Sequence, residues 1–257
     1  MTFLSAATVL TIALLSVNCD ATRFGGQHNG KHGFAFDKPW LIKKFKFQSK
    51  KIPCWKNVQY TVVNDCDWNS MRHPRDYPSS AHWSPLCGTT HNRAASVFKI
   101  GGISTDGVKQ VAEMGDCSTL QTEVLQCAKS GSCGNFLSYP CSAMDGTCTH
   151  SGTFDVTKKY PYLSLVSMAT PSPDWFVGVD SIDLCKNGFW MPNYEKYLLA
   201  NDAGTDAGPT FLSPDMPLAK REPISVFDAK DDSNIFYNIE QGQLNPLCKI
   251  TVTLKST

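Results

Sequence analysis

Cysteine content constrains this chain more than any other feature of its sequence. The chain has 257 residues and eleven cysteines, of which Cys19 lies just after an apolar N-terminal run. The remaining cysteines form an even set: Cys54, Cys66, Cys87, Cys117, Cys127, Cys133, Cys141, Cys148, Cys185 and Cys248. An even set behind a secretion signal is typical of a disulfide framework in an oxidising compartment. No Cys-x-x-Cys pair occurs, which disfavours a zinc site, and spacing alone does not fix which cysteines pair.

The N-terminal run FLSAATVLTIALLSV, at positions 3–17, is apolar and uncharged. It has the length of a signal-peptide core and is shorter than the roughly 18 apolar residues that a membrane-spanning helix needs. We therefore expect a signal peptide over residues 1–21 and a protein secreted to the extracellular space or matrix. An uncleaved anchor or a buried helix is the alternative interpretation. No other run is long enough to cross a membrane, so we expect no transmembrane segment.

Positive charge is concentrated directly after this run. Residues 20–52 hold eight basic and two acidic side chains, whereas the rest of the chain is mildly acidic. We expect residues 22–52 to be a basic flexible segment, because they offer little that would form a core. Such a segment can touch polyanions such as matrix glycans, or it is a solvated tail without a partner. A nucleic-acid role is not expected for a secreted protein whose main body is acidic.

From Cys54 onward the pattern is that of a β protein. Short β-branched and aromatic runs bounded by Pro and Gly predict strands at 58–63, 95–100, 162–168, 175–179 and 247–254. Helical spacing follows the Thr-Asp-Gly at 105–107 and recurs at 119–128. Residues 130–151 are rich in Cys, Gly and Ser, which predicts a surface loop held by its own bridges. Together these features predict a mainly β, antiparallel β-sandwich with small helical insertions, stapled by disulfides, as one domain over residues 53–257.

Three stretches, in this order, carry a family resemblance. They are HPRDYPSSAHWSPLCGTTH at 73–91, GGISTDGVKQVAEMG at 101–115, and a region that begins with PSPDWFVGVDSIDLC at 171–185 and includes DAGTDAG at 202–208. Together they resemble the spondin N-terminal domain family over residues 53–257. The resemblance implies a C2-like sandwich and a disulfide between Cys54 and Cys185.

The sequence also departs from the family pattern. No thrombospondin type 1 repeat follows the resemblance, so we expect a stand-alone spondin-type domain. Six cysteines fall at positions where the family does not place them: Cys66, Cys87, Cys117, Cys127, Cys133 and Cys141. The resemblance therefore supports the fold and a metal site more strongly than an adhesive role.

Three acidic residues stand out within these motifs: Asp174 in PSPDW, and Asp202 and Asp206 in DAGTD. The short Ala-Gly-Thr spacer, with Gly204 to allow the turn, lets two carboxylates face one point. Carboxylate and carbonyl oxygens suit Ca²⁺ or Mg²⁺. The resemblance implies that Asp174, Asp202 and Asp206 bind calcium. The alternative is that DAGTD is only a turn and Asp174 only a capping residue.

We do not expect an enzyme. The sequence has no G-x-S-x-G, H-E-x-x-H or glycine-rich phosphate loop. Cys148 lies two residues from His150, but a cysteine in an even, oxidised set is expected to be bridged and therefore no nucleophile.

The resemblance instead implies a matrix-binding or cell-adhesion module whose calcium site contacts an integrin-like receptor or a matrix or glycan ligand. The first alternative is a secreted carbohydrate- or lipid-binding defence protein. Trp83, Trp175 and Trp190 are then a candidate sugar-stacking platform, although core positions are the simpler interpretation. The second alternative is a structural matrix or shell component that is cross-linked through its cysteines.

Overall fold

Two antiparallel β-sheets face each other in the computed structural model, which describes residues 51–228 and 230–255. These residues belong to one compact unit. The predicted signal peptide, 1–21, and nearly all of the predicted basic segment, 22–52, lie outside the described residues. Among the described residues, no helix is both long and apolar enough to cross a membrane.

The first sheet has four strands in the order β10-β15-β1-β5. Its strands are β1 (Val58–Cys66), β5 (Thr149–Val156), β10 (Asn193–Leu198) and β15 (Cys248–Leu254). In β1, every second residue from Val58 is buried, because alternate side chains of a strand point to opposite faces. The sequence alternation therefore fixes which face of this sheet meets the core.

The second sheet follows the order β12-β11-β7-β6-β3-β4, with β2 paired to β6. Its strands are β2 (His82–Trp83), β3 (Leu86–His91), β4 (Cys133–Tyr139), β6 (Tyr162–Thr170), β7 (Trp175–Asp183), β11 (Asn201–Asp202) and β12 (Ser225–Val226). Two small hairpins complete the strands: β8 (Cys185–Lys186) with β9 (Phe189–Trp190), and β13 (Tyr237–Asn238) with β14 (Gln243–Leu244). Strands β6 and β7 are buried along nearly their whole length because both faces of this sheet are covered.

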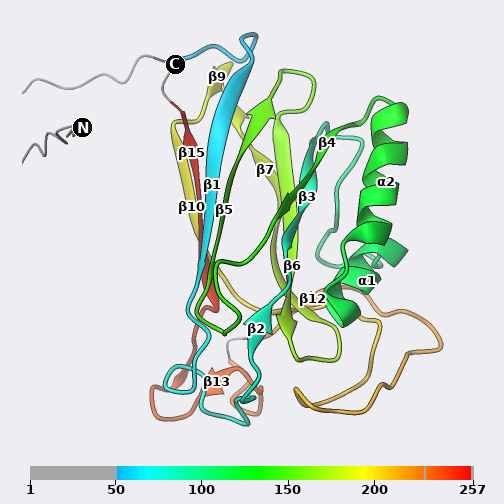
Figure 1. Ribbon diagram of the computed structural model, residues 1–257, viewed down its shortest axis with the longest axis vertical. Coiled ribbons are helices and arrows are strands. Elements are labelled where there is room, and N and C mark those ends of the chain that lie inside the picture. The colour runs from blue at the N-terminus through cyan, green and yellow to red at the C-terminus, as the bar shows by residue number, and fades with distance from the viewer. Residues whose placement is uncertain (1–50, 229, 256–257) are drawn as a thin grey trace, which may run out of the picture. The chain divides into compact units, whose positions relative to one another are not determined.

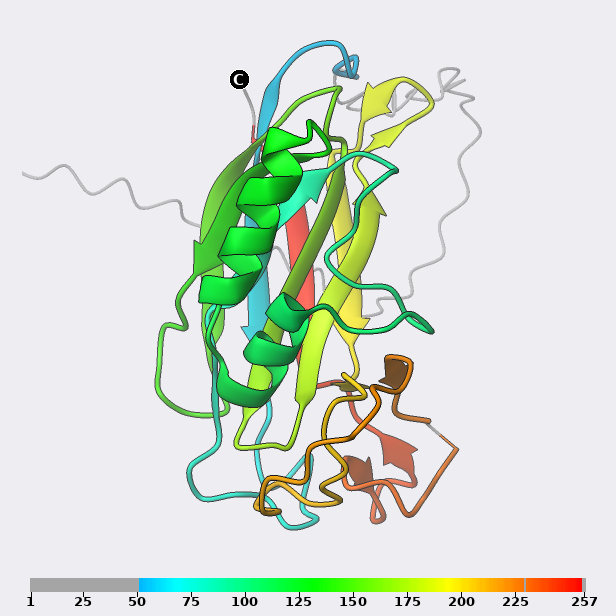
Figure 2. The same cartoon turned by 90° about the vertical axis from the view of Figure 1, so that its right-hand side faces the viewer.

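Two helices, α1 (Asp106–Met114) and α2 (Ser118–Lys129), cover the outer face of the second sheet, as Figures 1 and 2 show. Helix α1 begins as the sequence predicts: the Thr105 hydroxyl accepts a hydrogen bond from the Val108 amide, which caps the helix. It ends at Gly115, whose φ of 66° is the left-handed conformation that glycine adopts without strain. Val108 and Val111 pack with Phe176 of β7 in a second core layer.

Five disulfides confirm the predicted framework and use all ten cysteines of the described part. They are Cys54–Cys185, Cys66–Cys248, Cys87–Cys117, Cys127–Cys133 and Cys141–Cys148. The Cys54–Cys185 bridge is the pairing that the family resemblance implies. It ties the segment before β1 of the first sheet to the start of β8, which directly follows β7 of the second sheet.

Two local predictions are wrong. Residues 95–100 are not a strand, because no strand of the described chain pairs with them; Val97 and Phe98 instead pack into the second core layer, and the Ser96 hydroxyl bonds to Asp180. Residues 130–151 are only partly a loop, because β4 pairs with β3 in this region and β5 begins at Thr149. Few large apolar residues are enough for β4, since its disulfide to α2 holds it at the sheet edge.

Candidate metal centre

The three predicted aspartates lie in two segments at one end of the second sheet. Asp174 directly precedes β7, and Asp202 is the last residue of β11. Strand β11 pairs with the start of β7, with Asp202 opposite Trp175. This pairing brings Asp202 beside Asp174, although the two are 28 positions apart in the sequence. Asp206 follows Asp202 after a turn in which Gly204 has a φ of 70°.

Asp174 is fully buried, and its two carboxylate oxygens have different surroundings. Its Oδ2 accepts hydrogen bonds from the Thr205 amide at 2.7 Å, the Thr205 hydroxyl at 3.2 Å and the Asp206 amide at 3.2 Å. Its Oδ1 is buried and has no hydrogen-bond partner among the described residues. A buried polar atom without a partner is costly, so Oδ1 is suited to a ligand that supplies positive charge.

The electrostatics of this end favour a cation. Burial, followed by the negative charge of Asp202, raises the pKa of Asp174 to about 6. Burial also raises the pKa of Asp202, and the charges of Glu222 and Asp206 act in the same direction. These carboxylates therefore destabilise one another when all are ionised, and a divalent cation between them would remove that repulsion.

Asp206 has a different setting from the other two aspartates. Its Oδ1 accepts a hydrogen bond from the Gly208 amide and its Oδ2 accepts one from the Met216 amide, both at 2.7 Å. These bonds close the loop between residues 206 and 216. In this conformation Asp206 supports the loop with both oxygens, and a cation would have to share an oxygen with an amide donor.

The carboxylates do not form a closed cage. Within the described ranges, the one group of three potential ligand atoms lying within 4.8 Å of each other is Cys141, Cys148 and His150. That group is not a metal site, because the two cysteines are joined in a disulfide. The His150 ring nitrogens lie within hydrogen-bond distance of the Ser84 carbonyl and the Asn64 amide. The bridge also leaves Cys148 without the thiolate that a nucleophile needs.

Sequence reasoning missed Glu222. Its main-chain amide donates to the Gly204 carbonyl at 2.8 Å, and its charge raises the pKa of Asp202. A β-carbon on Gly204 would lie only 2.2 Å from the Glu222 carbonyl oxygen, so this close approach requires glycine. No spacing rule points to Glu222, because chain folding alone brings it back to the DAGTD turn.

An aromatic cluster packs around Trp175, the residue that follows Asp174. The Trp175 ring contacts Phe211, Phe227 and Phe236 edge to face, with ring centroids 5.2–5.4 Å apart. Trp83, Trp175 and Trp190 are each only 3% exposed, so they are core residues and form no sugar-stacking platform. Because Trp175 directly follows Asp174, its indole fluorescence should respond to changes at the three aspartates.

Comparison with known proteins gives consistent matches. The family model described as Spondin_N matches residues 58–246. The chain is 31% identical over 201 residues to Spondin-2 of Rattus norvegicus, which covers 76% of this chain and 61% of that protein. It is also 31% identical over 203 residues to Spondin-1 of Homo sapiens and of Bos taurus, which covers 76% of this chain and 25% of each relative. The chain thus spans less than two thirds of the length of these relatives.

Proposed function

Because the chain belongs to the spondin N-terminal domain family, whose model matches residues 58–246, we propose that it is a secreted extracellular-matrix and cell-adhesion module that binds its partner through a calcium site. The proposed ligands of the ion are Asp174, Asp202 and Asp206. The proposed partner is an integrin-like receptor on a cell surface, or a matrix or glycan ligand. Five disulfides support the extracellular location, because such bridges persist in oxidising compartments.

One observation carries the calcium proposal: the Asp174 Oδ1 atom is buried and has no donor among the described residues. Asp174 and Asp202 would be the main ligands, because their charges act on each other. Asp206 would be a third ligand, and one of its carboxylate oxygens would then bind the ion as well as accept a hydrogen bond from a main-chain amide. Calcium suits such a site better than magnesium, because Ca²⁺ accepts irregular sets of six to eight oxygens, whereas Mg²⁺ demands near-ideal octahedral geometry.

The loop that Asp206 closes supports a role in contacting a partner. It presents Leu212, which is 74% exposed, while the neighbouring Phe211 is buried in the aromatic cluster beneath the centre. The loop is therefore anchored through Phe211 and exposes an apolar side chain at the next residue. When bound, calcium would offset most of the negative charge of the three aspartates and offer its remaining coordination positions to an oxygen of the partner.

Calorimetric titration with Ca²⁺ tests the site. Wild type should release or absorb binding heat. The control variant Asp155→Asn should do the same, because Asp155 is an exposed aspartate on β5, in the other sheet. Asp174→Asn, and the double variant Asp202→Ala with Asp206→Ala, should give none. Equal heats from wild type and Asp174→Asn would reject the calcium site.

A cell-adhesion assay separates the partner classes. Cells should attach to surfaces coated with wild type, and both EDTA and Asp174→Asn should abolish attachment. Binding to glycan arrays or lipid vesicles without cell attachment would instead favour the carbohydrate- or lipid-binding alternative and would contradict the adhesive role.

A further inference from the structure

Strand β7 has an open edge over most of its length. On one side it pairs with β6, but on the other side β11 covers only Trp175 and Phe176. Beyond Phe176, no strand of the described chain pairs with this edge. An unpaired edge presents main-chain N–H and C=O groups that can bind a further strand.

The direction of these groups follows from β6. The Met168 carbonyl accepts from the Ser84 amide and the Met168 amide donates to Ser84 Oγ, so both Met168 groups point away from β7. The facing residue, Phe176, therefore also directs its main chain away from β6. Consistent with this, its carbonyl accepts from Asn201 Nδ2 at 3.2 Å on the β11 side. Because this direction repeats every second residue, the N–H and C=O of Gly178 point to the open edge.

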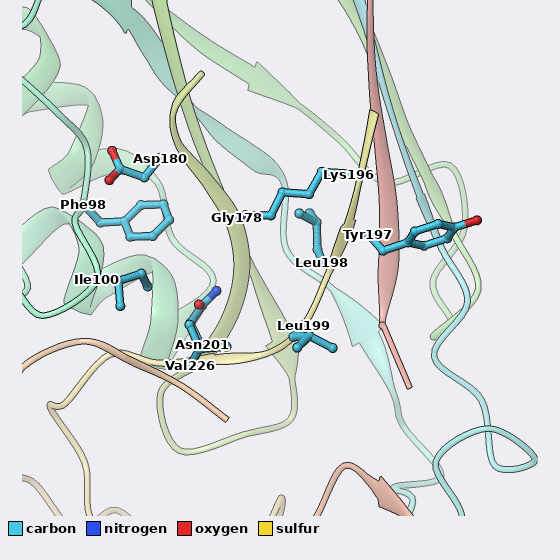
Figure 3. A pocket seen from close by; sticks show the side chains of 10 residues that line it. All are labelled: Phe98, Ile100, Gly178, Asp180, Lys196, Tyr197, Leu198, Leu199, Asn201 and Val226. Carbon is cyan, nitrogen blue, oxygen red and sulfur yellow. The ribbon is translucent and has the colours of Figure 1, made fainter. Parts of the chain in front are cut away.

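A cavity of about 340 Å³ lies along this edge, which is the size range of ligand pockets. Gly178 lines it, between one wall with Phe98 and Ile100 and a second wall that comes from β10 of the other sheet (Figure 3). Val226 of β12 adds to the apolar lining. The cavity therefore combines apolar walls with an unpaired strand edge.

Lys196 supplies the one cation of this lining. It lies on the same face of β10 as buried Leu198 and opposite buried Ile250, and its side chain is exposed to solvent at the sheet edge. Figure 3 shows its side chain reaching from β10 toward Gly178. Lys196 has no ion pair or hydrogen bond through its side chain with any residue of the described part.

The acidic residue of the lining does not neutralise Lys196. Asp180 accepts a hydrogen bond from the Ser96 hydroxyl at 2.8 Å and another from the Ser181 hydroxyl at 2.5 Å. Its carboxylate is thus directed to its own side of the cavity, where Figure 3 places it beside Phe98. Among the residues that line the cavity, none therefore supplies a negative charge next to Lys196.

We propose that this groove binds an extended peptide segment of a partner protein, which adds as a strand to the open edge of β7 at Gly178 and places an acidic side chain against Lys196. Main-chain hydrogen bonds to the edge give such a complex its geometry, and alternate side chains give it specificity. The acidic side chain would face β10, and its two neighbours in the peptide would face Phe98 and Ile100 on the opposite side. This binding mode is separate from the calcium site and does not require it.

Fluorescent heptapeptides test this proposal on the full chain. The probes have the sequence Ser-Thr-X-Glu-X-Thr-Ser, with X as Val, Ile, Leu or Tyr, and each has a matched version with Gln in place of Glu. A third version carries N-methyl groups at the two X residues, which removes main-chain donors while keeping the side chains. Fluorescence polarisation measures affinity, and hydrogen exchange read by mass spectrometry locates the bound segment.

At least one Glu probe should bind, about fivefold more tightly than its Gln version, as expected for one exposed ion pair. Lys196→Gln should remove that preference, whereas Lys186→Gln, an exposed lysine on β8, should keep it. N-methylation should abolish binding, and the bound probe should slow exchange in residues 176–180. The proposal is overturned if no Glu probe binds, if N-methylated probes bind equally well, or if the slowed exchange lies in another segment.

Discussion

Replacing Asp174 by Asn is expected to stabilise the calcium-free protein, which is an unusual result for a fully buried residue. Burial and the charge of Asp202 raise the pKa of Asp174 from its ordinary value of 3.8 to about 6. At pH 8 the folded protein therefore holds an ionised carboxylate that is easier to ionise in the unfolded chain. Two pKa units at about 1.4 kcal/mol each correspond to about 3 kcal/mol of lost stability.

Asparagine removes this cost and keeps the shape. Its carbonyl oxygen can accept the hydrogen bonds from Thr205 that Asp174 Oδ2 now accepts. Its amide then takes the place of Oδ1, the atom without a partner, as a donor near the carboxylates. Because the raised pKa makes the folded state bind a proton first, the calcium-free wild type should gain stability as pH falls from 7 towards 4. The variant lacks this contribution.

Thermal unfolding in EDTA and in millimolar calcium measures both effects. In EDTA at pH 8, the unfolding midpoint of Asp174→Asn should exceed that of wild type by about 6–12 °C, for about 3 kcal/mol in a domain of this size. Calcium should raise the midpoint of wild type and of the control Asp155→Asn, but not that of Asp174→Asn. A lower midpoint for Asp174→Asn in EDTA would refute the reasoning, because it would make Asp174 a structural acceptor whose charged hydrogen bonds outweigh its burial cost.

Two further predictions concern stability. Replacing both cysteines of the Cys54–Cys185 bridge by serine should cost about 5 kcal/mol of unfolding free energy in the chain-entropy account, because the bridge spans a sequence separation of 131. The same change at Cys141–Cys148, with a separation of only 7, should cost about 2.4 kcal/mol. Urea unfolding measures both losses, and equal losses would contradict this account. Burial lowers the pKa of His73 from 6.5 to about 4, so the unfolded chain binds the proton first, and His73 should cost up to about 3 kcal/mol of stability as pH falls from 6.5 to 4. Unfolding midpoints across this range should fall less for His73→Gln than for wild type, and parallel curves would exclude the role of His73.

Local signals account for the parts of the fold that sequence predicts well. The β1 strand is predictable from its own alternation, and the limits of α1 from Thr105 and Gly115, since each signal lies within a few residues of the structure it sets. The strand prediction for residues 95–100 fails because the apolar side chains of this segment pack against the two helices and the second sheet. Its composition matches a strand, but it has no neighbouring strand to pair with.

Non-local features explain what the sequence could not supply at the candidate centre. The resemblance pointed to Asp174 and Asp202, and pairing of β11 with β7 brings them together. Glu222 arrives through a main-chain contact with Gly204, for which no motif exists. The open edge beside Gly178 depends on β11 ending after two residues, which is a property of the tertiary structure and not of any local pattern.

Strand β11 connects the two proposed sites. It has only two residues, and successive side chains of a strand point to opposite sides. Asn201 lines the cavity beside the open edge of β7, whereas Asp202 lies with the carboxylates. An ion that fixed Asp202 would therefore also fix Asn201, which bonds to Phe176 where the open edge begins. Since two residues give β11 little pairing of its own, an ion bound at the proposed calcium site would help to order the start of the groove, although peptide binding at Gly178 would not require it.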